Sequence, residues 1–489
     1  MALALDQLLA GIGIKAPAIN LTDMQLDTRL LQPGSLFLAL KGHAVDGRLF
    51  MQQAEQKGAV AILFDNSDGF ETPQLSIPCI PVPALAEKIS YLAGIFYGSP
   101  AQKLALVGVT GTNGKSTCTQ LIANWTELLG QRAGMLGTIG NGRFGQLRVT
   151  ENTTGSAISI QQELACFVAD QVAVAAMEVS SHGLVQHRVS ALPFAAAVFT
   201  NLSRDHLDYH LTMEAYADAK RQIFKQSIPS HCILNTDDAV ARNWLKEMPD
   251  AVAYGIDEPL SDHPGRFVYA TDVKYHPQGV TVSIHSSWGD GVLSAPLLGK
   301  FNVSNILAAL AAMLVLQYDF KTLCQTASGL QPVTGRMECF GNHDQPLVVV
   351  DYAHTPDGLE KALQAARQHC HGRLFCLVGC GGDRDRGKRP QMAAIAEQWA
   401  DMLILTDDNP RTEDPAVIIA DMCSGLKKPE QVHIEHSRPK AIQLALSQAK
   451  PGDVILVAGK GHEDYQIIGN EKHHYSDRET VMQLLGVIL

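Results

Sequence analysis

Short apolar runs recur along this chain, and each one ends in a polar or glycine-rich segment. The clearest runs are Leu104–Val107, Val172–Met177, Ala195–Thr200, Leu347–Val350, Leu374–Val378, Met402–Thr406 and Val454–Ala458. Helix-length segments separate most of them, a pattern typical of buried parallel strands that alternate with helices. The pattern predicts an α/β fold whose parallel sheets carry polar loops along one edge.

Residues 1–100 are predicted to form a first, small α/β domain. Within it Ser35–Leu40 and Ala59–Phe64 have strand character, and Met51–Lys57 is a short helix that ends at Gly58. The loops Leu26–Arg29 and Gly42–Gly47 have the composition of ordinary turns. The segment 97–100 contains Gly and Pro and is a plausible linker to the next domain.

Two larger domains are predicted to follow, at residues 101–332 and 333–489. The first combines a parallel sheet with a β-rich insertion at about residues 255–298, where short alternating runs such as Gly279–Ile284 occur. In the second, four apolar runs each lead into a polar loop, which predicts a Rossmann-like doubly wound sheet with its ligand loops on one edge.

The most informative motif is the glycine-rich stretch Gly108–Thr117, between a predicted strand and a predicted helix from Cys118 to Leu129. In this arrangement backbone N–H groups and the helix N-terminus face phosphates, the lysine neutralises β/γ oxygens and the hydroxyl holds Mg²⁺. The common P-loop has a glycine five residues before Gly114, where this chain has Val109. A capped tight turn is the alternative, but it would not need Lys115 followed by Ser116.

Composition narrows the class of protein. A chain of 489 residues suggests about three domains. With 46% apolar and 18% charged residues it has the composition of an ordinary soluble protein, and its net charge of −11 argues against a nucleic-acid surface. The ten cysteines are scattered, and no export signal is visible. The longest apolar run, Ile306–Leu316, is too short to span a bilayer. These observations predict a cytoplasmic location.

Several charged groups have two interpretations from the sequence alone. Glu178 ends an apolar strand, where ligands of Mg²⁺–nucleotide complexes are found. The segment Asp205–His210 suits either a second cation or a solvated loop. Lys220 lies on a predicted helix from Glu214 to Phe224. Considered by itself, it would be interpreted as a surface lysine. The run from Arg384 to Arg389 holds four cations, either solvated or grouped at an anion site.

Taken together, these motifs resemble those of the Mur ligases of peptidoglycan synthesis, over essentially the whole chain and in three-domain order. Within that family the resemblance is greatest to ligases that add meso-2,6-diaminopimelate to UDP-N-acetylmuramoyl-L-alanyl-D-glutamate. The matching segments are Thr110–Thr117, Glu151–Thr154, Glu178–Gly183, Asp205–His210, Ala219–Lys220, Gly335–Arg336, Asp351–Pro356 and Asp408–Arg411.

The resemblance implies roles for individual residues in nucleotide and metal binding. ATP contacts fall on Gly111, Thr112, Asn113, Gly114, Lys115, Ser116 and Thr117, with Asn305 near the base, Arg336 near the phosphates and Asp351 near the ribose. Mg²⁺ ligands fall on Ser116, Glu178, His206 and Lys220, the last as its carbamate (N6-carboxylysine). The catalytic set implied is Lys115, Glu178, His206 and Lys220.

It also implies binding residues for the other two substrates. UDP-MurNAc-dipeptide contacts fall on Leu26, Thr28, His43, Ala44, Val45, Asn152, Thr153, Thr154, Ser180, Gln186 and Arg188, with Thr28 where the family commonly has serine. Diaminopimelate contacts fall on Arg384, Asp408, Asn409, Pro410, Arg411, Gly459 and Glu463. Arg411 would pair the extra carboxylate that distinguishes diaminopimelate from lysine; alternatively it forms a surface ion pair with Asp408 or Glu413.

The chemistry implied is ATP-dependent amide formation through an acyl phosphate in a monomeric enzyme of cell-wall synthesis, with no nucleic-acid or membrane partner. Two alternatives differ from it. Folylpolyglutamate synthetase shares the central nucleotide loop but lacks the first-domain loops and the Asp408–Arg411 motif. A non-enzymatic nucleotide switch on the same fold would be expected to have lost Lys115, Glu178 or Lys220, and all three are present.

Overall fold

The computed structural model describes residues 3–42, 45–71, 74–150, 152–260, 262–276, 279–341 and 344–486. It divides into two compact units. The first comprises Met1–Tyr269, Ser286–Trp288 and Asn305–Leu323, and the second comprises Ala270–His285, Gly289–Ser304 and Cys324–Leu489. The domain boundaries expected at residues 100/101 and 332/333 stay a prediction.

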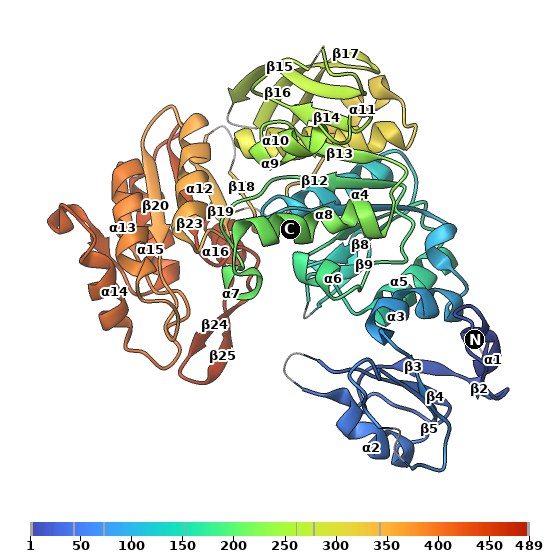
Figure 1. The fold of residues 1–489 in the computed structure, drawn as a ribbon. Coiled ribbons are helices and arrows are strands. Elements are labelled where there is room, and N and C mark those ends of the chain that lie inside the picture. The colour runs from blue at the N-terminus through green and yellow to red at the C-terminus, as the bar shows by residue number, and fades with distance from the viewer. Residues whose placement is uncertain are drawn as a thin grey trace. The chain divides into compact units, whose positions relative to one another are not determined.

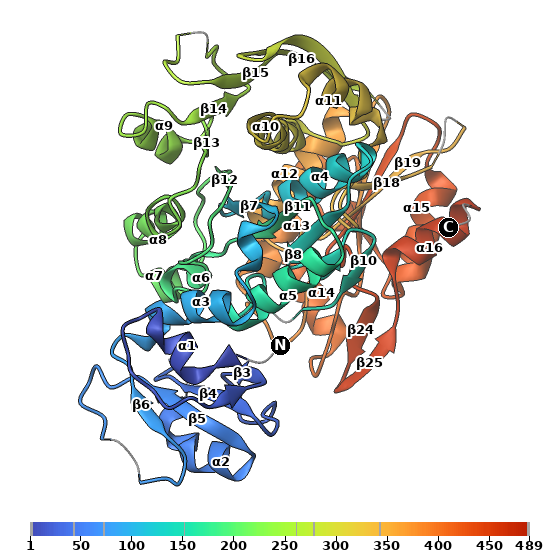
Figure 2. The same ribbon diagram turned by 90° about the vertical axis from the view of Figure 1, so that its right-hand side faces the viewer.

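The N-terminal part of the first unit is built on a parallel four-stranded sheet in the order β3-β4-β5-β6 (Figure 2). Its strands are β3 (Asp23–Gln25), β4 (Ser35–Ala39), β5 (Ala59–Phe64) and β6 (Cys79–Pro81), and its helices are α1 (Leu5–Ala10), α2 (Met51–Gln56) and α3 (Leu85–Phe96). A separate antiparallel pair joins β1 (Leu3–Ala4) to β2 (Asn20–Leu21). Every residue of β4 is buried, as expected for a strand covered on both faces.

The central sheet has the strand order β10-β9-β8-β11-β7-β12-β13-β14-β15-β16-β17. Pairing is parallel from β8 through β15, and β9 and β10 form an antiparallel edge. The strands are β7 (Ala105–Thr110), β8 (Ala133–Gly137), β9 (Gly140–Arg143), β10 (Gln146–Arg148), β11 (Val174–Glu178), β12 (Ala196–Phe199), β13 (Cys232–Asn235), β14 (Val252–Gly255), β15 (Phe267–His276), β16 (Gly279–Ser286) and β17 (Gly289–Ala295). The last three strands are the β-rich insertion that the sequence predicts.

Helices connect the central strands, as a parallel sheet requires. They are α4 (Lys115–Leu128), α5 (Ala157–Ala169), α6 (Ser181–Val185), α7 (Leu207–His210), α8 (Met213–Gln226), α9 (Ala239–Leu245), α10 (Lys300–Val315) and α11 (Phe320–Thr326). Short 3₁₀ helices cover Gly47–Phe50, Pro100–Gln102, Ala327–Gly329 and Pro429–Gln431. Along α10 the residues from Ile306 to Leu314 are buried on all sides, which explains the long apolar run in the sequence.

The C-terminal sheet has the order β18-β19-β23-β20-β21-β22, parallel except for the antiparallel edge strand β18. Figure 1 labels β18, β19, β20 and β23 of this sheet. Its strands are β18 (Glu338–Phe340), β19 (Leu347–Asp351), β20 (Leu374–Val378), β21 (Met402–Leu405), β22 (His433–Ile434) and β23 (Val454–Ala458). A hairpin of β24 (Tyr465–Ile468) and β25 (Glu471–His474) follows. The doubly wound sheet predicted for this region is therefore confirmed.

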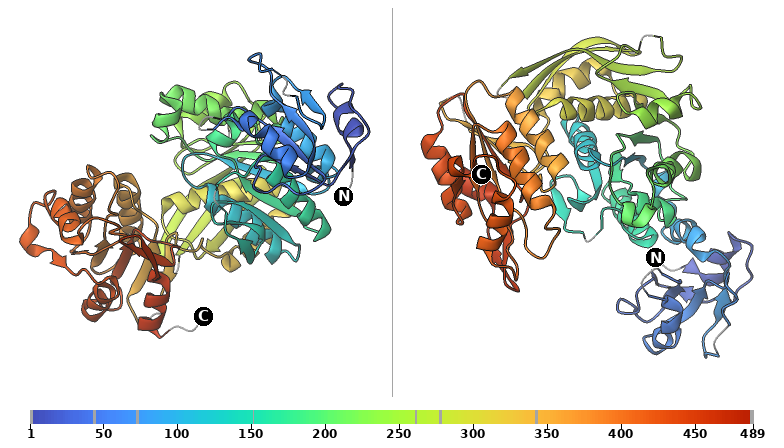
Figure 3. Two further views of the ribbon diagram at one scale, coloured as in Figure 1. Left: turned by 90° about the horizontal axis from the view of Figure 1, so that it is seen from below. Right: turned by 60° about the vertical axis from the view of Figure 1, so that its left-hand side comes forward.

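Helices cover both faces of this C-terminal sheet, which Figure 3 shows in orange and red from two directions. One core contains side chains of α12 (Pro356–Gln368), α13 (Lys388–Trp399) and α14 (Pro415–Cys423). The core on the opposite face contains side chains of α15 (Arg438–Gln448) and α16 (Asp477–Leu485). Alternate residues of the central strand β23 enter the two cores, so both faces of the strand are apolar.

Local sequence explains where the main helices begin. Thr355 caps α12 by accepting from Gly358 N, and Pro356 occupies its first turn. Asp414 and Pro415 repeat the arrangement at α14. No helix among the described residues is long and apolar enough to cross a bilayer.

Candidate active site

The loop between β7 and α4 wraps closely against its neighbours, and glycine is needed at two positions. Gly111 and Gly114 have φ values of +148° and +86°. A Cβ at Gly114 would collide with Asn305 Oδ1, and a Cβ at Gly111 would collide with Thr200 Oγ1. The predicted ATP residues 111–117 and Asn305 are therefore brought together, with Asn305 directly against the loop.

Two lysines converge on one carbonyl of this loop. Lys115 Nζ donates to Gly111 O at 2.9 Å and to Thr112 O at 2.8 Å, and Lys220 Nζ donates to Gly111 O at 2.7 Å. Lys220 comes from α8, and its ammonium also lies 4.4 Å from the centre of the Tyr216 ring. With 1% of its surface exposed, Lys220 is not the surface lysine that it suggests when taken alone.

Burial determines the protonation of Lys220. Loss of solvation lowers the pKa of its amine well below the ordinary value, the nearby Lys115 charge lowers it further, and Asp205 opposes both. A lowered pKa raises the fraction of the neutral amine, which is the nucleophilic form of lysine.

A buried carboxylate lies at the start of α4. Glu178, the last residue of β11, is 2% exposed and accepts from Ser116 Oγ at 2.9 Å and from Thr138 N at 2.8 Å. This set of hard oxygen atoms at a phosphate loop suits Mg²⁺, so the residues present fit the predicted metal. The sequence analysis did not predict a role for Thr138. Its position directly after a short apolar run, which is β8 in the structure, could have indicated one.

The segment Asp205–His210 divides into two environments. The His206 side chain is 47% exposed and lies 3.4 Å from Asp205, whereas His210 is buried and its Nε2 lies 2.8 Å from Ser181 Oγ. The described residues contain no group of three or more His, Cys, Asp and Glu side chains arranged for a metal ion. The predicted role of Ser116, Glu178, His206 and Lys220 as Mg²⁺ ligands stays a prediction.

Most of the predicted dipeptide-binding residues of the first unit lie beside Glu178. Thr154 Oγ1 donates to Glu178 O at 2.9 Å and accepts from Ser180 N at 2.9 Å. Arg188 Nη1 donates to Thr154 O at 2.6 Å and its Nε donates to Gln186 Oε1 at 3.0 Å. Burial lowers the pKa of Arg188.

Two further residues of the dipeptide set border this group. Thr153 Oγ1 accepts from Thr138 Oγ1 at 3.0 Å, and Asn152 is exposed. Thr153 therefore joins the polar group around Glu178, whereas no contact between the Asn152 side chain and the other described residues ties it to that group.

The predicted UDP residues belong to the N-terminal part of the chain. Thr28 is 8% exposed and its Oγ1 donates to Gln53 Oε1 at 3.1 Å, while Leu26 is half-buried and Val45 is exposed. His43 and Ala44 lie outside the described residues. The structure therefore describes only part of this predicted binding surface.

In the second unit, Arg336 and Asp351 are close to each other. The Arg336 guanidinium lies 4.6 Å from the centre of the Tyr352 ring. Asp351 Oδ2 accepts from Met337 N at 2.8 Å. Burial raises the pKa of Asp351, and the Arg336 charge opposes this. Gly335 is required beside them, because a Cβ there would collide with the backbone N of His462.

The predicted amino-acid residues gather where β21 and β23 end. Asn409 Nδ2 donates to Glu463 Oε2 at 3.1 Å. Asp408 is 8% exposed, and a Cβ added at Gly459 would lie 3.4 Å from Asp408 Oδ2. Pro410 is buried, and Arg384 is exposed with its Nη1 donating to Asp383 O at 3.0 Å.

Arg411 is held by backbone groups. Its Nη1 donates to Gly382 O at 2.8 Å, and its own backbone, at φ +50°, pairs with β24 through Arg411 N and Ile467 O. It forms no ion pair with any described residue, because Glu413 pairs with Arg389 at 2.8 Å instead. The alternative in which Arg411 pairs with Asp408 or Glu413 at the surface is therefore wrong.

The positively charged run that contains Arg384 is partly structural. The Arg389 side chain is fully buried and pairs with Glu413 and Asp421, each at 2.8 Å, and Arg386 pairs with Asp421 at 2.9 Å. The Arg389 hydrogen bond lowers the pKa of Glu413 to about 2. Arg386 and Arg389 thus fix the loop, and neither is free to hold a bound anion.

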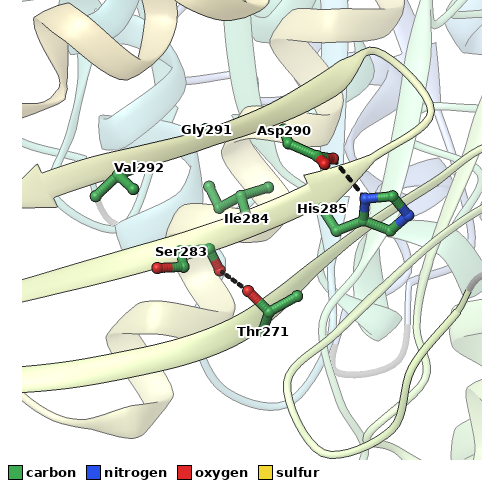
Figure 4. Close-up of a pocket in the computed structure, with 7 residues that line it drawn as sticks. All are labelled: Thr271, Ser283, Ile284, His285, Asp290, Gly291 and Val292. Carbon is green, nitrogen blue, oxygen red and sulfur yellow. Dashed lines mark hydrogen bonds and ion pairs between the residues drawn. The ribbon is translucent and has the colours of Figure 1, made fainter.

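A hollow of about 430 Å³ lies on strands β15–β17 (Figure 4). None of the residues that line it is a predicted site residue. It is lined by Thr271, Ser283, Ile284, His285, Asp290, Gly291 and Val292. Its polar groups are already engaged with each other, since His285 Nδ1 pairs with Asp290 and Thr271 Oγ1 donates to Ser283 O.

Comparison with known proteins gives a consistent result along the whole chain. Residues 20–97 match the model "Mur ligase family, catalytic domain", residues 109–313 match "Mur ligase middle domain", and residues 335–461 match "Mur ligase, glutamate ligase domain". A solved UDP-N-acetylmuramoyl-L-alanyl-D-glutamate–2,6-diaminopimelate ligase is 35% identical, with a TM-score of 0.76 and 99% of each chain covered. The chain belongs to the Mur ligase family.

More distant structures share the fold of this Mur ligase. The MurF ligase of Thermotoga maritima in complex with ADP is 18% identical, with a TM-score of 0.57 over 95% of this chain and 96% of that one. Folylpolyglutamate synthase of Mycobacterium tuberculosis, complexed with ADP and AMPPCP, is 18% identical with a TM-score of 0.59, and covers 76% of this chain and 92% of its own. At these identities only the fold is shared.

Family membership establishes the general activity. The chain is an ATP-dependent ligase that forms an amide bond on a peptidoglycan precursor, and its substrates include ATP and a UDP-muramoyl peptide. The α/β architecture with three Mur ligase domains is likewise confirmed.

Proposed function

We propose that this ligase adds meso-2,6-diaminopimelate to the D-Glu residue of UDP-N-acetylmuramoyl-L-alanyl-D-glutamate. The observation that carries the proposal is the placement of Asp408, Asn409, Arg411 and Glu463 in the loops after β21 and β23, where Asn409 Nδ2 donates to Glu463 Oε2 at 3.1 Å and Arg411 Nη1 lies 3.5 Å from Asn409 O. It combines a guanidinium with two carboxylates, which complements a substrate end that has both a carboxylate and an ammonium group. The 35% identical diaminopimelate ligase supports the same substrate.

The reaction proceeds through an acyl phosphate. The γ-carboxylate of D-Glu attacks the γ-phosphorus of ATP, and ADP leaves. The amine of diaminopimelate then attacks the acyl carbonyl, loses a proton and expels inorganic phosphate. Lys115, which already donates to loop carbonyls, is placed to turn toward the phosphate oxygens and neutralise the charge that develops there.

Two Mg²⁺ sites belong to the proposal. Ser116 and Glu178 would hold one ion, and His206 with the carbamate of Lys220 would hold the other; bound Mg²⁺ would supply charge neutralisation of the phosphate oxygens. The lowered pKa of Lys220 supports carbamate formation, because only the neutral amine reacts with CO₂. A carbamate would also exchange a buried cation for an anion next to Lys115.

The remaining predicted residues complete the proposal. Leu26, Thr28 and residues 43–45 would contact the UDP moiety, and the polar group of Thr154, Ser180 and Arg188 would hold the muramoyl dipeptide. Asn305, Arg336 and Asp351 would hold the nucleotide. The enzyme would act in the cytoplasm as a monomer, in cell-wall biogenesis and thereby in cell shape and division.

The test is a comparison of amino-acid substrates in wild type and Arg411→Ala. Lysine lacks the distal carboxylate and would leave Arg411 unpaired, so wild type should prefer meso-diaminopimelate over L-lysine by ~10²-fold or more in kcat/KM. Arg411→Ala should lose most of that preference, because kcat/KM for diaminopimelate falls while kcat/KM for lysine stays the same. Phosphate release that depends on UDP-dipeptide and amino acid gives both rates.

Arg373→Ala is the matched control, because Arg373 is an exposed arginine of the same unit whose partner is Asp453 and which lies before β20, at the end of the strand opposite the ligand loops. It should keep the wild-type preference. Equal use of lysine and diaminopimelate by wild type, or unchanged diaminopimelate kinetics in Arg411→Ala, would contradict the proposal.

A further inference from the structure

A fully buried lysine lies beneath the proposed amino-acid site. Lys460, in the loop after β23, has a side-chain exposure of 0%, and its Nζ donates to Glu463 Oε2 at 3.0 Å and to Asn409 Oδ1 at 3.2 Å. The same ammonium lies 3.5 Å from Asp408 Oδ1. One charge therefore contacts three of the residues proposed to bind the amino acid.

The backbone around Lys460 has little freedom. Gly459 and Gly461 flank it with φ values of +120° and +51°, which favour glycine. A Cβ at Gly461 would lie 2.6 Å from Gly335 O, so this loop packs directly on another backbone segment. Because the loop cannot move far, the ammonium of Lys460 is fixed relative to its partners.

Lys460 cancels part of the negative charge of this group. Asp408 and Glu463, which Lys460 contacts, contribute two negative charges, and Lys460 contributes one positive charge. Each uncancelled negative charge in a buried site raises the cost of accepting a ligand end that carries a carboxylate, relative to an end that is a cation. The distal end of diaminopimelate is a zwitterion and the distal end of lysine is a cation, so the charge of Lys460 favours diaminopimelate.

One acceptor in the group still lacks a hydrogen bond. Asp408 Oδ1 is buried, and among the described residues its only close cation is Lys460, at 3.5 Å and without hydrogen-bond geometry. An unsatisfied buried carboxylate oxygen is costly, so it is a natural acceptor for an ammonium group of a ligand.

We propose that Lys460 is a positioning and specificity-determining residue for the amino-acid substrate. It holds Glu463 and Asn409 in place, and it cancels one carboxylate so that the site favours a zwitterionic substrate end over a cationic one. The inference rests on the proposed function, since it concerns the same site.

The first test is Lys460→Met, which keeps the length of the side chain and removes its charge. Asp408 and Glu463 then lose the positive charge that they contact, so KM for meso-diaminopimelate should rise at least ~10-fold and the preference over L-lysine should fall at least ~10-fold. KM for ATP and for the UDP-dipeptide should change less than about twofold, because neither substrate is assigned to this group.

Lys472→Met is the matched control. Both lysines lie over the ring of Tyr465: Lys472 Nζ is 3.7 Å from the ring centre and Lys460 Nζ is 5.5 Å from it. Lys472, however, is exposed on β25. It should leave all three KM values and the amino-acid preference at wild-type levels.

The double variant Lys460→Met/Glu463→Gln removes the ammonium together with the carboxylate that it contacts at 3.0 Å, so the net charge of the group stays at its wild-type value. It should still prefer diaminopimelate over lysine, and it decides the matter even if Lys460→Met does not fold, because Glu463 is not left as a carboxylate without its cation. The inference is overturned if the double variant prefers lysine. It is also overturned if a folded Lys460→Met keeps the wild-type KM for diaminopimelate, or if its KM values for all substrates rise together.

Failure of the inference differs from failure of the proposed function. A wild-type enzyme that does not ligate diaminopimelate would refute the proposed function whatever Lys460 does. If the wild-type enzyme ligates diaminopimelate but the Lys460 variants give one of the outcomes that overturn the inference, only the role of Lys460 is refuted.

Discussion

Lysines in two regions of this ligase are held in opposite ways. At the phosphate loop, Lys115 and Lys220 both donate to the carbonyl of Gly111. At the amino-acid site, Lys460 donates to a carboxylate and a carboxamide and lies near a second carboxylate. No carboxylate of the described residues is within ion-pair distance of Lys220.

The difference shows how the same side chain serves two purposes. A carbonyl dipole compensates only part of the cost of burying an ammonium, which is why the pKa of Lys220 is lowered and its amine becomes reactive. Carboxylate partners compensate the charge, so Lys460 serves as a fixed cation that organises its neighbours. A buried lysine on backbone groups therefore suggests chemistry, and one among acids suggests positioning.

The largest expected effect concerns Lys220. Lys220→Ala should be nearly inactive, with kcat at least ~10³-fold lower, because it removes the carbamate that would hold a metal ion. Formate or acetate should restore part of the activity by replacing the lost carboxylate. Turnover is measured with and without these anions, and normal turnover of a folded Lys220→Ala protein would refute its role in the reaction.

A smaller loss is expected for Lys115. Lys115→Ala should lower kcat by at least ~10²-fold with the fold intact, because charge on the transferred phosphoryl group loses its counter-ion. Lys225→Ala, which removes an exposed lysine from the same α8 helix that carries Lys220, is the control and should behave as wild type. Near-normal turnover in Lys115→Ala would overturn the phosphate-loop assignment.

The smallest effect is on stability. Between the lowered pKa of folded Lys220 and the pKa of about 10.4 for an unfolded lysine, the unfolded chain binds more protons, so stability rises with pH. Below the folded pKa the cost of burying the charge is fully present. From pH 7 to pH 9 wild type should therefore gain stability relative to Lys220→Met, by at most about 1.4 kcal/mol per pH unit.

Urea titrations in CO₂-free buffer give the two free energies of unfolding. Lys225→Met should follow wild type, since that lysine is exposed. Parallel curves for wild type and Lys220→Met would mean that Lys220 titrates alike in the folded and unfolded chains.

Much of the fold could be predicted because its signals are local. The central strands β7, β11, β20 and β23 are short apolar runs, and a glycine or polar residue marks the end of each. The contact between Glu178 and Ser116 followed from the same logic, because β11 pairs in parallel with β7 and the residues after both strands meet at one edge.

The burial of Lys220 depends on distant residues, yet a local signal existed. Lys220 follows Tyr216 by four residues and precedes Ile223 by three, so it shares the buried face of α8 with them. Its partner Gly111, however, is 109 residues away, and nothing near Lys220 specifies that carbonyl. The same applies to Lys460, whose partner Asn409 is 51 residues away.

The strand order of the two large sheets also sets when each site can form as the chain is made. The phosphate-loop strand β7 lies between β11 and β12, so both its neighbours exist once residue 199 has been synthesised. In the C-terminal sheet β23 lies between β19 and β20, and it is complete only at residue 458. The strands that flank the nucleotide loop can thus pair early on the ribosome, whereas the Lys460 network, which follows β23, must be among the last parts of the enzyme to fold.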